Sequence, residues 1–439
     1  MARAKKEAAL TPEERLQAAL VPDWEWPYKL PENWCWVYAP HIFDIEYGKG
    51  LPTKQLSDTG YPVFGANGQI GFYSEYMYKE PQALMSCRGA YSGTMNKSLP
   101  YSYVTSNSLI ISSPRGLMGT DCIYYLFSAL NVSELISGTA QPQVTVQAFD
   151  GFPIPLSPLA EQRRIVDRIE SLFSKLDEAK EKAQAVVDSF ETRKAAILHK
   201  AFTGELTAKW RKEHDVGMES WEYKTFEAIV ENMQNGLAKR KGISGTPYVV
   251  LRLANLTDCG FNTDDLREIL LDEKEQANYE LRPNDVIMIR VNGSKDNVGK
   301  QYLITNQHHW AFCDHIIRIQ YSNRLLPQYM IYFSRSKNYR IYVKENIVSS
   351  AGQNTISRKG MVGLVVPIPC LNEQFEIVHI LDDLFSKEQQ SKEAAEAALD
   401  QINLMKKSIL ARAFRGELGT NDPNEESAVE LLKKVFQKE

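Results

Sequence analysis

Residues 161–180 read EQRRIVDRIESLFSKLDEAK, and residues 373–392 read EQFEIVHILDDLFSKEQQSK. The two stretches also end alike, in ILHKAFTGEL at 197–206 and in ILARAFRGEL at 409–418. Both ends of the match have the same offset (373 − 161 = 212 and 418 − 206 = 212), so the copies align without a gap. A long internal repeat of this kind indicates a fold built from two similar halves.

Each copy is predicted to form one long helix, which ends near Gly204 in the first copy and near Gly416 in the second. Apolar residues in the first copy recur at alternating steps of four and three, the heptad pattern of a coiled-coil seam. The residues predicted at the coiled-coil or partner interface are Ile165, Ile169, Leu172, Leu176 and Phe190, with Ile377, Leu381, Leu384, Ile402 and Ile409 in the second copy.

The second helix is less apolar than the first, because Glu388 and Ser391 stand where the first copy has Leu176 and Ala179. A plain dimerisation coil would not need this asymmetry. Two unlike helices packed as an antiparallel coiled coil within one chain, with polar positions left for partners, explain it better. The dimerisation coil is the alternative.

The segments before the helices correspond as well. Each closes with Pro-Ile-Pro, at 153–155 and 367–369, and each has a Gln-x-x-[Val/Ile]-[Thr/Ser] element shortly before, at 141–145 and 353–357. Short β-type runs such as 108–112 and 285–291 alternate with turn residues, which predicts an α+β fold with a pseudo-twofold repeat. The expected order is an N-terminal segment 1–33, a globular domain 34–156, a helix 157–206, a linker 207–220, a second domain 221–369, a helix 370–418 and a tail helix 419–439.

Composition limits the partners and the compartment. The net charge of −4 excludes a simple polycation, so any surface for nucleic acid must be locally positive. Six cysteines without a CxxC pair are predicted to be reduced and buried. The polar N-terminus has no apolar segment behind it, so a cytoplasmic protein is expected.

With both copies in register, the layout resembles that of the specificity subunits of type I restriction–modification systems over nearly the whole chain. The resemblance is carried by Pro158-Leu-Ala-Glu-Gln-Arg-Arg-Ile, by the helix ends Phe-Thr-Gly-Glu-Leu and Phe-Arg-Gly-Glu-Leu, and by the Gln-x-x elements before Pro-Ile-Pro. It implies a non-catalytic subunit in defence against foreign DNA, whose two target recognition domains each read half of a split, asymmetric site in double-stranded DNA.

The resemblance also implies the partners. The paired helices would fix the gap between the half-sites and dock two adenine-methyltransferase subunits, to which ATP-driven restriction motor subunits attach. The complex would use S-adenosylmethionine, ATP and Mg, with none of them bound by this chain.

Polar and basic loops are the candidates for DNA contact, because arginine can read guanine, Asn and Gln can read adenine, and lysine can hold phosphate. The candidates in the first domain are Asn67, Gln69, Arg88, Tyr91, Ser92 and Lys97. Those in the second are Lys239, Arg240, Lys241, Arg290, Asn292, Ser294, Lys295 and Asn297. The alternative is that these loops are ordinary turns and that the arginines are structural ion-pair partners.

Three other patterns are set aside. Residues 293–300 resemble a phosphate loop, but five residues separate the glycines and Gln301 follows the lysine. The adenine-methyltransferase signature Asn-Pro-Pro-Tyr does not occur. His308, His309, Cys313 and His315 are close in sequence, but alternation along a strand would separate their side chains, so no metal site is predicted.

Two other functions are compatible with the repeat. One is a tandem protein-interaction scaffold that does not bind DNA. The other is a fragment of a fused restriction enzyme, which the missing catalytic motifs disfavour.

Overall fold

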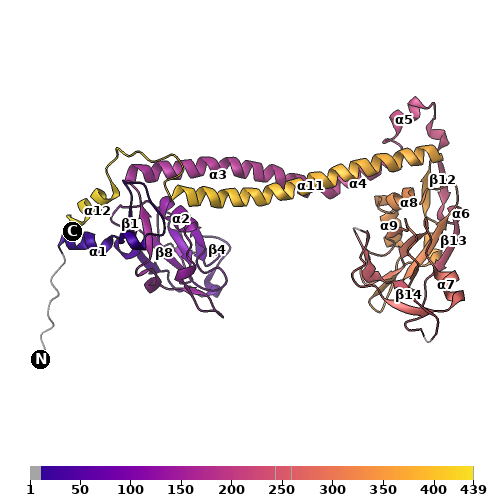
Figure 1. The fold of residues 1–439 in the computed structure, drawn as a ribbon, viewed down its shortest axis with the longest axis horizontal. Helices are drawn as coiled ribbons and strands as arrows, with labels where there is room; N and C mark the ends of the chain where they lie inside the picture. Colours follow the sequence, from indigo (N-terminus) through magenta and orange to yellow (C-terminus); the bar gives the residue numbers. More distant parts are fainter. Residues whose placement is uncertain (1–10, 243, 259, 439) are drawn as a thin grey trace. The chain divides into compact units, whose positions relative to one another are not determined.

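The computed structural model describes residues 11–242, 244–258 and 260–438, so the first ten residues of the predicted N-terminal segment lie outside the described part. The chain divides into two units, Met1–Ala183 with Ala397–Glu439, and Gln184–Glu396. Each unit contains one strand-rich domain and part of the long helices (Figure 1). The predicted α+β class is therefore confirmed.

The domain of the first unit has a four-stranded sheet, a three-stranded sheet, a closing strand pair and a short pair of β9 (Ile136–Ser137) with β10 (Gln143–Val144) among the described residues. The four-stranded sheet has the order β2 (Asp44–Tyr47), β8 (Ser108–Ser112), β5 (Ala83–Ser86), β6 (Met95–Lys97). The three-stranded sheet has the order β4 (Gly68–Tyr73), β3 (Tyr61–Gly65), β7 (Tyr103–Val104), and β1 (Cys35–Tyr38) pairs with β11 (Pro153–Leu156).

The domain of the second unit repeats this arrangement. Its four-stranded sheet has the order β13 (Val230–Asn235), β22 (Ile316–Tyr321), β18 (Val286–Ile289), β20 (Gln301–Leu303). Its matching three-stranded sheet has the order β17 (Glu268–Leu271), β14 (Thr246–Leu251), β21 (Trp310–Phe312), and β12 (Glu222–Thr225) pairs with β25 (Val365–Ile368). In both domains the three-stranded sheet has one antiparallel and one parallel pairing. The repeat seen in the sequence thus extends to the strand order.

One central strand of each four-stranded sheet is buried at every position, as the apolar runs in the sequence require. All four residues of β5 and all four of β18 are buried. A helix packs in the core beside each of them, α2 (Thr120–Ala129) in the first domain and α8 (Pro327–Phe333) in the second. Strands covered on both faces read as continuous apolar runs, which explains why 285–291 is so apolar.

The first long helix is interrupted, which corrects the prediction of a single helix. It consists of α3 (Leu159–Asp188) and α4 (Phe190–Phe202), with Ser189 between them. The Ser189 hydroxyl donates to the carbonyl of Ala185 at 2.5 Å, and the Arg193 guanidinium donates to the carbonyl of Val186 at 3.2 Å. A side chain that takes up a helix carbonyl competes with the backbone ladder and bends the helix. The second copy is one uninterrupted helix, α11 (Leu371–Ala413).

Both predicted helix-ending glycines are confirmed. Gly204 has φ +81 and Gly416 has φ +74, the left-handed conformation that ends helices. Short helices lie near both ends of the described chain, and the second falls within the predicted tail helix 419–439. They are α1 (Pro12–Ala19), capped by Thr11, and α12 (Ala428–Phe436).

Within each unit the long helices pack antiparallel. In the first unit Lys406 pairs with Asp177 at 2.6 Å and lies 4.8 Å from the ring centre of Phe173. In the second, Lys392 lies over the ring of Phe190 at 4.9 Å, and Glu388 pairs with Arg193 at 2.7 Å. Glu388 therefore contacts its own chain, which corrects the expectation that this polar position is left for a partner.

The predicted interface residues fall into two groups. Ile165 and Ile169 join the hydrophobic core of the first domain, and Ile377 and Leu381 join that of the second, so these residues fix each helix to its domain. Phe190 and Ile402 are buried, and the residues Leu172, Leu176, Leu384 and Ile409 are half-buried. Their part in binding a partner stays a prediction.

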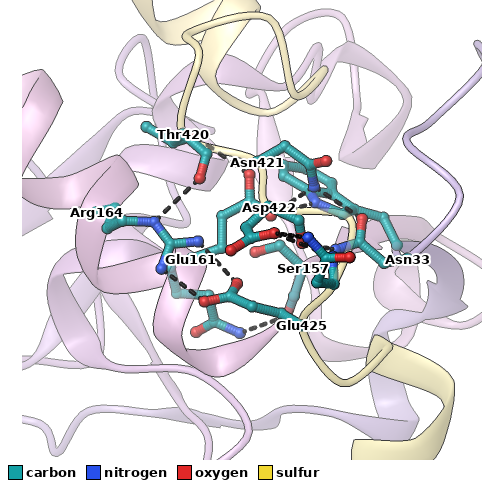
Figure 2. A network of polar contacts seen from close by, with 11 residues as sticks. Asn33, Ser157, Glu161, Arg164, Thr420, Asn421, Asp422 and Glu425 are labelled. Atoms are coloured by element: carbon teal, nitrogen blue, oxygen red, sulfur yellow. Dashed lines mark hydrogen bonds and ion pairs between the residues drawn. The ribbon is translucent and has the colours of Figure 1, made fainter.

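A buried carboxylate ties the start of α3 to its domain (Figure 2). Glu161 is fully buried and accepts hydrogen bonds from Trp34 Nε1 at 2.7 Å and from Asn421 Nδ2 at 2.9 Å. The Thr420 hydroxyl donates to its other oxygen at 3.2 Å. Arg164 pairs with Glu425 at 2.7 Å beside this network. The segment after α11 is thereby fixed to the first domain.

The second unit has the equivalent arrangement. Glu373 at the start of α11 is fully buried and accepts from Trp221 Nε1 at 3.0 Å and from the Thr207 hydroxyl at 2.6 Å. Arg211 forms an ion pair with it at 2.5 Å. The linker after α4 thus does in the second unit what the segment after α11 does in the first.

The cysteine prediction needs one correction. Cys35, Cys87, Cys122 and Cys313 are buried and free, but Cys370, directly before α11, is exposed. Cys259 lies outside the described residues. Among the described helices, none combines the length and the apolar character that crossing a membrane requires.

Candidate nucleic-acid interface

The loop after β5 carries three of the predicted contacts in the first domain. Arg88 and Tyr91 are exposed, Tyr91 by 50%. The Ser92 hydroxyl donates to the carbonyl of Pro142 at 2.8 Å, and the amide of Gly89 donates to the same carbonyl at 2.9 Å. The loop is therefore held against the Gln-x-x element. Ser92 is occupied in this contact, while Arg88 and Tyr91 are free to meet a ligand.

The β3–β4 hairpin lies beside this loop. Asn67 is in the two-residue turn and Gln69 is at the start of β4, and both are exposed. The Ser86 hydroxyl, two residues before Arg88, donates to the carbonyl of Ala66. The structure thus brings two predicted groups, Asn67 with Gln69 and Arg88 with Tyr91, to one end of the domain.

Lys97 is not part of this group. It pairs in β6 with Ala83, the first residue of β5, whereas Arg88 follows the other end of that strand. Its ammonium is 2.7 Å from the carboxylate of Asp121. Lys97 therefore supports the structural alternative, an ion pair on the surface.

The loop after β18 is the counterpart in the second domain. Asn292 lies in the short strand β19 (Val291–Asn292), which pairs with β24 (Gln353–Thr355). Its side-chain oxygen accepts from the amide of Ser294 at 2.9 Å and from Asn297 Nδ2 at 3.5 Å, so these residues shape the turn. Lys295 is exposed, and within the described chain no carboxylate pairs with it.

The basic run 239–241 lies close to the same loop but is largely neutralised. Lys239 pairs with Glu275 at 2.7 Å, and this hydrogen bond lowers the pKa of the Glu275 carboxyl. Arg240 pairs with Asp314 at 3.1 Å, and Arg290 donates to the carbonyl of Asp314 at 3.3 Å. Asp314 therefore connects the predicted contacts at 239–241 with those at 290–297. Lys241 is exposed.

Arg88 and Arg290 do not occupy equivalent positions in the two domains; they differ by one residue along the strand. The carbonyl of Cys87 accepts from the amide of Val144, and that of Arg290 accepts from the amide of Ile356. Arg290 therefore corresponds to Cys87. Because successive strand residues point to opposite faces, half-buried Arg290 and exposed Arg88 are directed differently.

Sequence reasoning missed the amide side chains opposite these loops. Gln143 forms an isolated antiparallel β-bridge with Arg88, and Gln353 lies at the start of β24. Both side chains are exposed. The signal was present, since both belong to the repeated Gln-x-x element, but that element was used only to mark the domain ends. Gln143 and Gln353 are further candidates for DNA contact.

The possible metal ligands are brought together differently from the sequence expectation. Cys313, Asp314 and His315 lie in a turn, and their ligand atoms are within 4.8 Å of one another. Arg240 already pairs with Asp314 at 3.1 Å, so a cation from the protein itself occupies this carboxylate. His309 contacts Glu280 at 2.8 Å and His308 stacks on Trp310, so neither joins the group.

Comparison with known proteins identifies the family. The model of the type I restriction modification DNA specificity domain matches twice, at residues 31–187 and 220–399. The chain belongs to this family. The family predicted from the repeat is confirmed, and each match covers one strand-rich domain together with part of the helix that follows.

Individual relatives agree. The chain is 34% identical over 290 residues to the type I restriction enzyme StySPI specificity subunit of Salmonella potsdam, a match that covers 65% of this chain and 62% of that protein. It is 30% identical over 317 residues to the EcoKI specificity subunit of Escherichia coli K12, with 69% of this chain and 68% of that protein covered. The match thus spans somewhat under two thirds of the first relative's length.

Solved structures share the fold. A chain from a structure on complex assembly and conformational transition of a type I restriction–modification system matches with a TM-score of 0.63 and 19% identity, covering 89% of this chain and 100% of that one. The crystal structure of the HsdS subunit of Thermoanaerobacter tengcongensis matches with a TM-score of 0.56 and 19% identity, covering 89% of this chain and 99% of that one.

Proposed function

We propose that this chain is the subunit that reads the DNA sequence for a type I restriction–modification complex, with one half-site read by each strand-rich domain. One observation carries the proposal: the two domains have the same strand order but different side chains on their corresponding loops. Arg88 and Tyr91 are exposed after β5, whereas Lys295 is exposed after β18. Two like frameworks with unlike loops suit an asymmetric site in two parts.

The chain is proposed to act without a catalytic site of its own, in the cytoplasm. Two adenine-methyltransferase subunits and the restriction motor subunits are the proposed protein partners. S-adenosylmethionine, ATP and Mg are proposed to be used by the complex and held by those partners.

The experiment that tests the proposal is sequencing of methylated adenines in cells with and without the chain. We expect one split, asymmetric motif to lose methylation when the chain is absent. An unchanged methylation pattern would contradict the proposal. Binding of a duplex that contains the motif, measured across a salt series, separates DNA contact from a protein scaffold, since phosphate contacts give a steep salt dependence.

The paired helices are proposed to form one antiparallel coiled coil that sets the gap between the half-sites. Supporting this, α11 has 43 residues, roughly 65 Å at the rise of a helix, and it is paired in both units. Insertion of a heptad at matched points of both helices lengthens them by about 10 Å, or about three base pairs. We expect methylation of the native motif to be abolished; persistence of that motif would refute the spacer.

A further inference from the structure

A cavity of about 370 Å³ lies in the second unit, where α4 and Phe385 of α11 face β20 and the turn at Arg335. None of the predicted DNA-contact residues is among its lining residues. Its volume is in the range of small-ligand sites. Its charged lining consists of Lys194, Lys300, Arg335 and Arg340 with Glu191 and Asp258. Four cations against two carboxylates leave a net charge of +2 (4 − 2) on the lining groups.

Three of the four cations are positioned by groups other than a close carboxylate. Arg340 donates to the carbonyls of Asp296 and Val298 at 2.8 and 2.9 Å. Lys194 lies 5.0 and 5.8 Å from the ring centres of Phe190 and Phe385.

The carboxylates near these cations compensate little of their charge. Glu191 is 3.9 Å from Lys194, and its side chain is 81% exposed. Arg335 packs over the ring of Tyr332, and within the described chain it has no ion pair. Lysine and arginine held in place in this way can bind an anion without first losing side-chain freedom.

The fourth cation has a partner at the rim. Lys300 pairs with Asp258 at 2.5 Å, and the Asp258 side chain is 81% exposed. The hydrogen bond from Lys300 and the charges of Lys300, Arg335 and Lys194 lower the pKa of the Asp258 carboxyl. Cations of α4 (Lys194) and of the strand-rich domain (Lys300 and Arg335) therefore all act on the Asp258 carboxylate.

The wall behind the cations includes Gln301 and Tyr302. The side chain of Gln301 donates to Tyr339 and accepts from Tyr321, both at 2.9 Å. Burial raises the pKa of the Tyr302 hydroxyl to about 12, so this lining group stays neutral beside the cations.

The cavity adjoins the candidate DNA loop. The two carbonyls that hold Arg340 belong to Asp296 and Val298, at the end of the loop that contains Lys295 and Asn297. Lys300 also lies at the end of this loop, directly before β20. A ligand that binds Arg340 in the cavity would thus act on the loop through the hydrogen bonds from Arg340 to Asp296 and Val298.

We propose that this cavity binds a phosphate group, held by Lys194, Lys300, Arg335 and Arg340. A phosphate offers more acceptor oxygens to these four donors than the two of a carboxylate, and a terminal phosphate carries up to two negative charges, whereas a backbone phosphodiester carries one. The phosphate comes either from the backbone of the duplex or from a free nucleoside phosphate. The first source rests on the proposed DNA reading, and the second does not.

The test compares the full chain with Lys194→Gln/Arg335→Gln and with the matched control Lys337→Gln/Lys359→Gln, which removes two exposed lysines outside the cavity. One arm, with the methyltransferase partners present, measures how binding of the cognate duplex depends on salt. Loss of one phosphate contact lowers the slope by about 0.9. The other arm measures binding of ATP and of pyrophosphate to the chain by calorimetry, where about a tenfold loss is expected.

A change that the control lacks supports the site. A change in the duplex arm indicates a backbone phosphate, and a change in the calorimetric arm indicates a free nucleoside phosphate. Equal behaviour of variant and control in both arms overturns the proposal. So does a loss confined to assembly with the methyltransferase, since the cavity then holds a partner's carboxylate. Should the double variant fail to fold, exposed Arg335→Gln alone gives the same comparison. If the native chain binds no DNA, the proposed function fails while the calorimetric arm still decides the site.

Discussion

Single side chains in this protein differ most in whether a partner neutralises them. Lys97, Lys239 and Arg240 each have a carboxylate within 3.1 Å, whereas Arg88 and Lys295 are exposed and have no ion pair in the described chain. An exposed, unpaired cation can meet DNA without breaking an existing contact. The first group therefore has a structural role in the free chain, and the second is available for binding.

Arg88→Ala is expected to weaken binding of the assembled complex to its cognate duplex by about 1–3 kcal/mol and to relax the preference at one base pair. Lys97→Ala, which removes a cation already paired with Asp121, is the control and should change binding much less. Gel shifts with base-substituted duplexes measure both effects. Equal losses in the two variants would show that Arg88 makes no special contact.

Glu161→Ala is expected to destabilise the first unit by about 3 kcal/mol, because it leaves the buried donors of Trp34 and Thr420 without this acceptor. Hydrogen exchange of the β1 amides reports this loss. Glu178→Ala removes an exposed carboxylate from the same helix and should change stability by no more than about 0.5 kcal/mol. Similar protection in both variants would show that the network contributes little.

Among the helices, the two copies of the repeat begin and end alike but differ in the middle. Glu161 and Glu373 begin them, and Gly204 and Gly416 end them. Ser189 interrupts only the first copy, since its hydroxyl and Arg193 take helix carbonyls there. The shared ends fix each helix to a domain, and the divergent middle contains the helix–helix contacts.

Gly416→Ala should be more harmful than Gly204→Ala. Both positions have positive φ, which costs a residue with a Cβ about 1–2 kcal/mol. A Cβ at Gly416 would also lie 2.3 Å from the ring of Pro31, whereas at Gly204 it would meet the flexible Met218 at 2.7 Å. The order of thermal midpoints is expected to be Gly293→Ala, then Gly204→Ala, then Gly416→Ala from highest to lowest. Gly293 is the control, since its φ is not positive and nothing lies near its Cβ. A different order would contradict the steric argument.

For the chain as a whole, the main consequence of the fold is that each unit is completed by a segment that follows a long helix. The first unit is completed by the segment after α11, where Thr420 and Asn421 reach Glu161 and α12 packs beside α1 (Figure 1). The second is completed by the linker, through Thr207 and Arg211. Each unit is therefore expected to respond separately to damage.

Truncation of the chain after Leu418 should loosen the first unit and leave the second intact. It deletes two donors to Glu161 and the buried side chains of Leu432 and Phe436, each of which contributes about 1.5–3 kcal/mol. Hydrogen exchange resolved by peptide measures both units in one sample. A chain that ends at Phe436 is the control, because the residues it lacks are exposed where described. Equal loss of protection in both units would contradict this division.

Local patterns in the sequence were sufficient for the repeat, the long helices, the ends of these helices, the α+β class and the family. Heptad spacing, capping residues and alternation act over a few residues, so they can be read without a fold. The break at Ser189 was missed because heptad spacing continues through it, and the break depends on which carbonyls two side chains take.

The partners of charged groups depended on the folded chain. Asp121 is 24 residues from Lys97, Asp314 is 74 from Arg240, and Thr420 is 259 from Glu161. No periodicity links positions so far apart, because strand pairing and helix packing bring them together. For the same reason the phosphate cavity, whose lining runs from Glu191 to Phe385, has no motif in the sequence.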